Sequence, residues 1–473
     1  MPLLRTTLLL VVLLLARGVA AQVEPITSDS FEEQVQKAFD ARDYRKAADL
    51  LERQLKSSPN DPVVLYNAAC AWSRLGDLDR ASDRLFKAVQ AGFMDFAHME
   101  RDPDLDAMRE HPVYRQILDI RDEAFTRFAE RQLEGARRQF GENGYRYETD
   151  REHRLNFATA LDEVAHAEMR DMLRVQADHL AAVLFEAPPD YYTLIAVPTP
   201  EDSARLIRDA KIGGIYEHPR RRLVARDIGI MLRHEFTHLM HYGHMERLRQ
   251  SHPIWIQEGI ACLYESYEII NGKTLRVLPN QRHNIVKFLL QRDQLPAWSD
   301  LFAMSGDAFM DQAEHTYPVA RSIFHFLLAR RKLTEWYRAY TESFDDDPTG
   351  ARAFETVFNE PLADVERRWK QWVRVQPMVD DVVRRGDASL GVEFDQEGSN
   401  DGVLIVRVLP GSGAEEAGLR SGDVIVSVNG QPTRSFLELL PVIGGRKVGD
   451  VVTVRVRRGA EYHAAQVTLR PLR

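Results

Sequence analysis

The chain has little cysteine, no low-complexity tract and no excess of positive charge. Only Cys70 and Cys262 lie beyond the first apolar stretch, in segments expected to form different domains, so we expect no disulfide framework. The net charge of -9 and the isoelectric point near 6.0 give no indication of nucleic-acid or anionic-lipid binding. With 44% hydrophobic and 28% charged residues the composition is globular. The length favours about three domains.

Long apolar runs are also lacking, except at the N-terminus. Arg5 precedes an apolar run over residues 8–15, and small residues at 19–21 precede Gln22. This order is typical of a secretory signal peptide, so we expect residues 1–21 to be cleaved and the protein to be periplasmic or secreted. An uncleaved membrane anchor is the alternative, although the run is much shorter than the roughly 20 residues that span a bilayer.

Residues 30–93 repeat themselves with a period of 34. Three apolar positions recur in this frame: Tyr44, Ala47 and Leu51 return as Leu78, Ala81 and Leu85. Apolar residues at such intervals let short antiparallel helices pack within one unit and against the next. The pattern resembles a pair of tetratricopeptide repeats, which implies a helical region over 30–142 with later helices as a cap and a surface for a protein partner. An ordinary helical bundle is the alternative.

The remaining sequence has two textures. From 145 to 376 it alternates short strands with helices, as expected of an α+β domain. Strands are predicted over 145–149, 155–160 and 191–197 and a hairpin over 213–225; helices are predicted over 163–185, 254–269, 283–291, 316–330, 333–344 and 362–373. From 386 to 473 the chain is rich in Val, Gly and period-two alternation, which predicts a small β-rich domain.

One pentapeptide carries the strongest chemical signal, His234-Glu235-Phe236-Thr237-His238. On a helix, positions i and i+4 lie on one face about a turn apart, so both imidazoles can reach one metal ion. Glu235 lies beside the first histidine, where a carboxylate can take a proton from water at the metal. Two histidines alone do not complete such a site, and a third ligand is needed.

Two residues compete for the third position. His244 lies ten residues after His234, which is the third-ligand spacing of the metzincins. That pattern needs a glycine at the position of His241, where the chain turns out of the helix, and Gly243 comes two residues late. The other candidate, Glu258, is favoured.

Glu258 lies in the motif WIQEGIA, residues 255–261. The motif resembles the W-x-x-E-G-x-A helix of the gluzincin clan, in which the glutamate is the third zinc ligand about twenty residues after the second histidine. Glu258 lies twenty residues after His238. In that clan a glutamate seven residues further on supports the ligands, and Glu265 matches it. Seven residues are two helical turns, so the two glutamates are expected to share a helix face.

The resemblance covers roughly residues 145–376. This segment is similar to peptidase-MA-like domains of bacterial envelope proteins, which implies that the protein is an enzyme. One zinc ion held by His234, His238 and Glu258 would leave a fourth position open to water, with Glu235 as the general base. The clan often uses a tyrosine from a later helix to stabilise the oxyanion, and Tyr317 resembles that residue. A tyrosine that only packs at a helix start is the alternative.

The last segment, 386–473, resembles the PDZ domains of bacterial envelope proteases. Leu390, Gly391 and Val392 look like the loop whose N–H groups receive a peptide carboxylate, and residues 417–425 and 428–430 match the turn-and-strand signature. The resemblance implies that a C-terminal peptide adds a strand to the open sheet edge. Some such domains only pack against a neighbour.

These patterns predict a zinc metallopeptidase of gluzincin type that acts on proteins or peptides of the cell envelope, with both flanking modules recruiting substrate or partners. Two alternatives stay open, an inactive scaffold with a vestigial metal site and a zinc hydrolase of a non-peptide substrate. The joint presence of Glu235, Glu258 and Glu265 argues against the scaffold. No nucleic-acid partner is expected, and no stable membrane span after signal cleavage.

Overall fold

The computed structural model describes residues 30–209, 212–379, 385–395 and 399–472. The chain divides into two compact units, 1–131 and 132–473. The predicted signal peptide lies outside the described residues. Within the described part, no helix combines the length and the apolar character that crossing a membrane requires.

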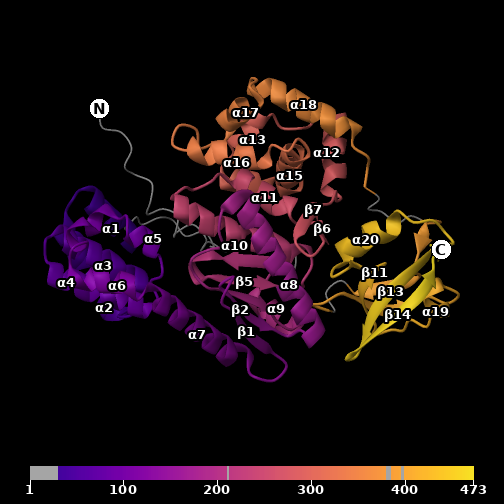
Figure 1. Cartoon of the computed structure of the whole chain (residues 1–473), viewed down its shortest axis with the longest axis horizontal. Helices are drawn as coiled ribbons and strands as arrows, with labels where there is room; N and C mark the ends of the chain where they lie inside the picture. The colour runs from indigo at the N-terminus through magenta and orange to yellow at the C-terminus, as the bar shows by residue number, and fades with distance from the viewer. Residues whose placement is uncertain (1–29, 210–211, 380–384, 396–398, 473) are drawn as a thin grey trace, which may run out of the picture. The chain divides into compact units, whose positions relative to one another are not determined.

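The first unit is built of helices (Figure 1). Its elements are α1 (Phe31–Asp40), α2 (Tyr44–Ser57), α3 (Pro62–Arg74), α4 (Leu78–Ala91), α5 (Phe96–Met99), a 3-10 turn (Pro103–Met108), α6 (Pro112–Asp119) and the first part of α7 (Arg121–Phe140). Consecutive helices α1 to α4 pack against one another.

The turns of this unit repeat with the same 34-residue period. Asp43 caps α2 by accepting the Lys46 N–H at 3.1 Å, and Asp77 caps α4 by accepting the Arg80 N–H at 3.1 Å. The residue before each cap is left-handed, Arg42 in one turn and Gly76 in the other. Equivalent caps at equivalent positions define a structural repeat. Its assignment to the tetratricopeptide family stays a prediction.

The second unit begins with a five-stranded sheet. Its strands are β1 (Arg146–Asp150), β2 (Leu155–Thr159), β3 (Thr193–Val197), β4 (Gly214–Glu217) and β5 (Arg222–Ala225). The order is β1-β2-β3-β5-β4, with parallel pairs in the centre and an antiparallel pair at each edge. The predicted strands and hairpin are confirmed to within two residues.

The two faces of this sheet bury different side chains. On one face, Phe157, Ile195 and Leu223 pack in the large core with helices α8 (Glu163–Leu180) and α10 (Ile230–Leu248). On the other face, Ala158 and Leu194 pack with Ala136 in the last part of α7. Because strand side chains alternate between faces, the larger apolar set lies under the helix that carries the histidine motif.

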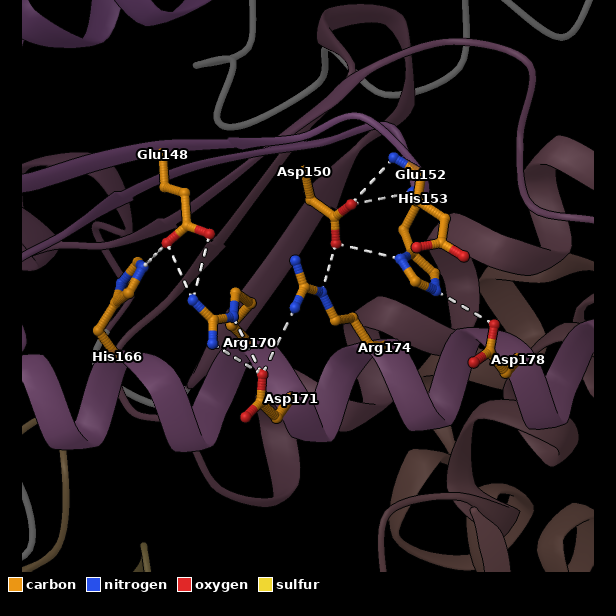
Figure 2. Close-up of polar contacts among 9 residues, drawn as sticks. All are labelled: Glu148, Asp150, Glu152, His153, His166, Arg170, Asp171, Arg174 and Asp178. Atoms are coloured by element: carbon orange, nitrogen blue, oxygen red, sulfur yellow. Dashed lines mark hydrogen bonds and ion pairs between the residues drawn. The ribbon is translucent and has the colours of Figure 1, made fainter. Parts of the chain in front are cut away.

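Edge strand β1 is fixed to α8 by charged side chains (Figure 2). From β1, Glu148 reaches His166 at 2.8 Å and Asp150 reaches Arg174 at 2.6 Å. Asp150 also contacts His153 at 3.1 Å, and the opposite ring nitrogen of His153 lies 3.1 Å from Asp178. Each histidine lies against a carboxylate, so this cluster satisfies its own charges and holds the strand to the helix.

Helices form most of the remaining core. The elements are a π-helical turn (Ala181–Phe185), α9 (Pro200–Leu206), a 3-10 turn (His218–Arg220), α11 (Ile254–Leu263), β6 (Tyr267–Ile270), β7 (Thr274–Val277), α12 (Arg282–Gln291), α13 (Trp298–Phe302), α14 (Gly306–Asp311), α15 (Ala313–Ala329), α16 (Leu333–Glu342), α17 (Ala351–Phe358) and α18 (Leu362–Val375).

One predicted helix is too long. The helix expected over 254–269 ends at Leu263, and β6 and β7 form an antiparallel hairpin beyond it. Asn271 and Gly272 both have positive φ, 52° and 67°. Three residues, 271–273, connect the two strands, and an Asn-Gly pair with this backbone favours a tight hairpin turn, which overrides the helical pattern before it.

Helices α11 and α15 pack closely at Gly259. A Cβ there would lie 2.6 Å from the ring of Phe324 and 3.1 Å from the carbonyl oxygen of Ala320. We therefore expect Gly259→Ala to lower the free energy of unfolding by about 1–3 kcal/mol, since the added methyl must displace a buried ring and backbone. Urea unfolding measures this. Gly306→Ala is the control, because nothing lies within 4 Å of that Cβ position; an equal effect in both variants would contradict the packing account.

The C-terminal part of the second unit is β-rich, as predicted. It comprises β8 (Ala388–Ser389), β9 (Val392–Asp395), β10 (Val403–Val408), α19 (Gly413–Glu416), β11 (Val424–Val428), β12 (Gln431–Pro432), α20 (Phe436–Gly444), β13 (Val451–Arg458), β14 (Glu461–Thr468) and β15 (Arg470–Pro471). Its main sheet has the order β14-β13-β11-β10-β9, with β9 at one edge. Its core is separate from the large core.

Candidate metal centre

Helices α10 and α11 bring together three side chains of the kind that bind metals, His234, His238 and Glu258, here called the triad. Nε2 of His234 and Nε2 of His238 lie 3.1 Å apart. Oε2 of Glu258 lies 3.2 Å from the first nitrogen and 3.4 Å from the second. Three ligands of one tetrahedral zinc ion, each about 2.0–2.1 Å from the metal, would lie about 3.3 Å from one another. The spacing of these buried atoms therefore fits one zinc ion.

The electrostatics of these groups favour a positive charge among them. Nδ1 of His234 lies 3.0 Å from Glu265 and donates to it, which directs Nε2 toward the other two ligand atoms. Burial raises the pKa of Glu258, but the two histidines hold it well below its usual range, so Glu258 is ionised. Burial lowers the pKa of His234, but its hydrogen bonds to Cys262, Glu258 and Glu265 raise it well above its usual range, so a positive charge is favoured at this place. Two imidazoles and a carboxylate are a donor set typical of zinc.

Glu265 orients the first histidine. Its carboxylate, 1% exposed, accepts from Arg282 Nε at 2.7 Å and Nη2 at 2.8 Å. The expectation that Glu265 shares a helix face with Glu258 is wrong. Because α11 ends at Leu263, Glu265 lies beyond the helix and contacts His234 rather than sharing a face with Glu258. Arg282 was missed, since no motif spacing links it to the site.

Glu235 is held by the neighbouring edge strand. Its Oε2 accepts the backbone N–H of Tyr216 in β4 at 2.9 Å. A Cβ at Gly214 would lie 3.0 Å from Cγ of Glu235, so β4 runs close to this carboxylate. The carboxylate is therefore fixed against β4, an edge strand of the sheet.

Tyr317 lies on α15, with its ring near that of His234. Its ring is 6.4 Å from that of His234, and its hydroxyl donates to Sδ of Met310 at 3.1 Å. Burial and the charge of Glu258 raise the pKa of Tyr317 well above its usual range. The hydroxyl thus stays protonated and able to donate.

His244, the competing third ligand, does not join the triad. Its ring packs against Phe185 and Tyr337, each with centroids 5.6 Å away. Burial lowers the pKa of His244 to about 4. Its neighbour His241 pairs instead with His252, at 2.8 Å. These histidines are parts of a buried aromatic cluster.

The predicted peptide-binding loop lies at the start of β9. Leu390 is buried, and its carbonyl oxygen accepts from Ala414 at 3.0 Å. Gly391 has a φ of 78°, and a Cβ there would lie 2.3 Å from Cβ of Ser412, so the loop requires glycine. Val392 then begins the edge strand.

Comparison with known proteins identifies this C-terminal domain. Residues 388–469 match the family model described as PDZ domain. The chain is 42% identical over 80 residues to the probable periplasmic serine endoprotease DegP-like of Marinomonas sp. (strain MWYL1), covering 17% of each protein. It is 40% identical over 68 residues to the periplasmic pH-dependent serine endoprotease DegQ of Escherichia coli (strain K12), covering 14% of this chain and 15% of that one. The chain thus spans less than a fifth of these relatives.

One solved structure also aligns with a similar share of this chain. The HtrA3 PDZ domain bound to a phage-derived ligand aligns with 23% identity and a TM-score of 0.16, over 17% of this chain and 84% of that one. The family model alone identifies residues 388–469 as a PDZ domain, as the turn-and-strand signature predicted.

These relatives overturn the predicted enzyme class. The sequence predicted a zinc metallopeptidase of gluzincin type, whereas the relatives are serine endoproteases. The physical reason lies in what the motif specifies. Two histidines and a glutamate at these spacings define how side chains surround a cation, and that geometry does not by itself determine a reaction.

Proposed function

We propose that this chain is a PDZ-containing hydrolase of the cell envelope, with one zinc ion held by His234, His238 and Glu258. The observation that carries the proposal is the buried triangle of ligand atoms, with sides of 3.1, 3.2 and 3.4 Å. The bond attacked is a non-peptide acyl bond such as an ester, because Glu235 can accept a proton and Tyr317 can donate to an oxyanion.

The chain's own residues have distinct roles in this scheme. Zinc, when bound, would polarise a carbonyl and acidify water. Glu235, held at Oε2 by the Tyr216 N–H, accepts the proton of the attacking water and passes it to the leaving group. Tyr317 exchanges its bond to Met310 for one to the carbonyl oxygen as charge develops there.

The PDZ domain supplies recognition in this proposal. Edge strand β9 would pair with an extended peptide whose carboxylate meets the backbone of residues 390–392. The repeat unit would bind a protein partner. The periplasm is the proposed location, since the relatives are named as periplasmic and residues 1–21 have the pattern of a signal peptide.

The test compares wild type with Glu235→Gln. We expect one zinc per chain in both, and hydrolysis of a panel of ester substrates slower by about 100- to 10,000-fold in the variant, because the proton acceptor is lost while the ligands remain. Elemental analysis and substrate turnover measure the two quantities. Glu314→Gln, an acidic residue in the first turn of α15 outside the triad, is the control.

A second measurement, inhibition by a reagent that modifies active-site serines, separates this proposal from the serine chemistry of the relatives. Hydrolysis that a fluorophosphonate blocks and a zinc chelator leaves intact would refute the proposed mechanism. Zinc-free wild type, after purification with zinc present, would refute the metal site itself.

A further inference from the structure

The helix that carries the metal ligands begins against the PDZ domain. At Gly229, the N-cap of α10, a Cβ would lie 2.9 Å from Oε2 of Glu438 and 3.0 Å from Cβ of Ser435. Next to it, the Ile228 N–H donates to the carbonyl oxygen of Asn400 at 3.2 Å. Glycine therefore leaves the space in which the start of α20 meets the start of α10.

A buried ion pair joins the two helices at this point. Arg233, the residue directly before His234, is 6% exposed, and its Nη2 donates to Oε1 of Glu438. The second oxygen of Glu438 accepts the Arg434 N–H at 2.9 Å. Glu438 is thus fixed within its own domain and presents one oxygen to α10. Among the described residues, Glu438 is the carboxylate that forms an ion pair with Arg233.

Arg233 is also tied to the rest of its own domain. Its carbonyl oxygen accepts from Gln176 of α8 at 2.9 Å and from Thr237 of α10 at 2.8 Å. Its guanidinium lies 5.2 Å from the ring centre of Tyr267, whose hydroxyl donates to Gln176 at 2.9 Å. A shift of the guanidinium would therefore change the position of the first two turns of α10, which contain His234 and Glu235.

Further charges make the contact complementary. Asp162, the N-cap of α8, accepts the Tyr462 hydroxyl at 2.9 Å. Glu168 of α8 pairs with Arg434 and, at 3.2 Å, with Arg455 of the PDZ sheet. Opposite charges thus meet at two separate places, which favours one docked arrangement.

We propose that Glu438 of the PDZ domain is a positioning residue for the metal centre, acting through Arg233 on the first turns of α10. The PDZ domain is then part of the scaffold that holds the ligands, in addition to any role in peptide binding. This inference rests on the proposed metal site and does not depend on which bond is hydrolysed.

The experiment measures metal binding in the full-length chain. Zinc affinity comes from competition with a chromophoric chelator, and the geometry of the site comes from the visible spectrum of the Co²⁺-loaded protein. We expect Glu438→Gln to weaken zinc binding by about tenfold, as for other residues that orient metal ligands indirectly, and to change the Co²⁺ spectrum. Hydrogen exchange of the 228–238 backbone should become faster.

Three further variants fix the interpretation. Arg233→Lys keeps the charge and should stay within about threefold of wild type, and the exchanged pair Arg233→Glu with Glu438→Arg should recover most of the affinity. Glu416→Gln, which removes a carboxylate from an exposed PDZ pair with Arg470, is the control and should match wild type.

The outcomes separate this inference from the proposed function. If Glu438→Gln matches wild type in affinity, spectrum and exchange, the positioning role is wrong while the metal site stands. A charge exchange that restores nothing would overturn the direct pair. Absence of zinc binding in wild type would overturn both proposals.

Discussion

Replacing Glu258 by glutamine is expected to weaken zinc binding by more than about 100-fold. The substitution keeps the size of the side chain but removes the negative charge at the third corner of the triangle, where Oε2 lies 3.2 and 3.4 Å from the two imidazole nitrogens. Chelator competition at constant pH measures the dissociation constant of zinc.

His244→Gln is the matched control for this prediction. It removes the histidine at the alternative spacing, and its ring lies in the aromatic cluster with Phe185 and Tyr337. We expect zinc binding to remain within about threefold of wild type, since no ligand is lost. If His244→Gln weakened binding more than Glu258→Gln, the assignment of the third ligand would be wrong.

Replacing Arg282 by methionine is expected to lower the free energy of unfolding by about 3–5 kcal/mol. The substitution leaves the fully buried carboxylate of Glu265 without the guanidinium that contacts both of its oxygens at 2.7 and 2.8 Å. The contact with His234 would then compensate this charge only in part, and removing one partner of a buried ion pair is strongly destabilising. Urea unfolding of the zinc-free chain, followed by tryptophan fluorescence, measures the change.

Arg276→Met is the control for the buried pair. Arg276 also pairs with a glutamate, Glu268, but its side chain is 63% exposed, so we expect a change below about 1 kcal/mol. Equal unfolding midpoints for the two variants would show that the pair of Glu265 and Arg282 does not stabilise the fold.

The sequence predicted those parts of the site that local spacing determines. His234, Glu235 and His238 lie on one helix, so their relation follows from helical geometry. The caps at Asp43 and Asp77 follow from a 34-residue repeat that is visible in the sequence. The PDZ signature is likewise a set of local turns and strands.

Tertiary contacts were beyond such patterns. The backbone of Tyr216 reaches Glu235 only because β4 lies at the sheet edge beside α10, and Arg282 reaches Glu265 only because α11 ends early. The helix end itself depends on the turn at Asn271 and Gly272, a residue pair outside the motif. The largest error was the predicted enzyme class, because the reaction was inferred from the geometry of the metal ligands.

The most direct test of the account is a crystal structure with anomalous scattering data collected at the zinc absorption edge. The account predicts one anomalous peak per chain, about 2.0–2.2 Å from Nε2 of His234, Nε2 of His238 and the carboxylate of Glu258. No peak in crystals grown with zinc, or a peak beside His244 instead, would contradict it.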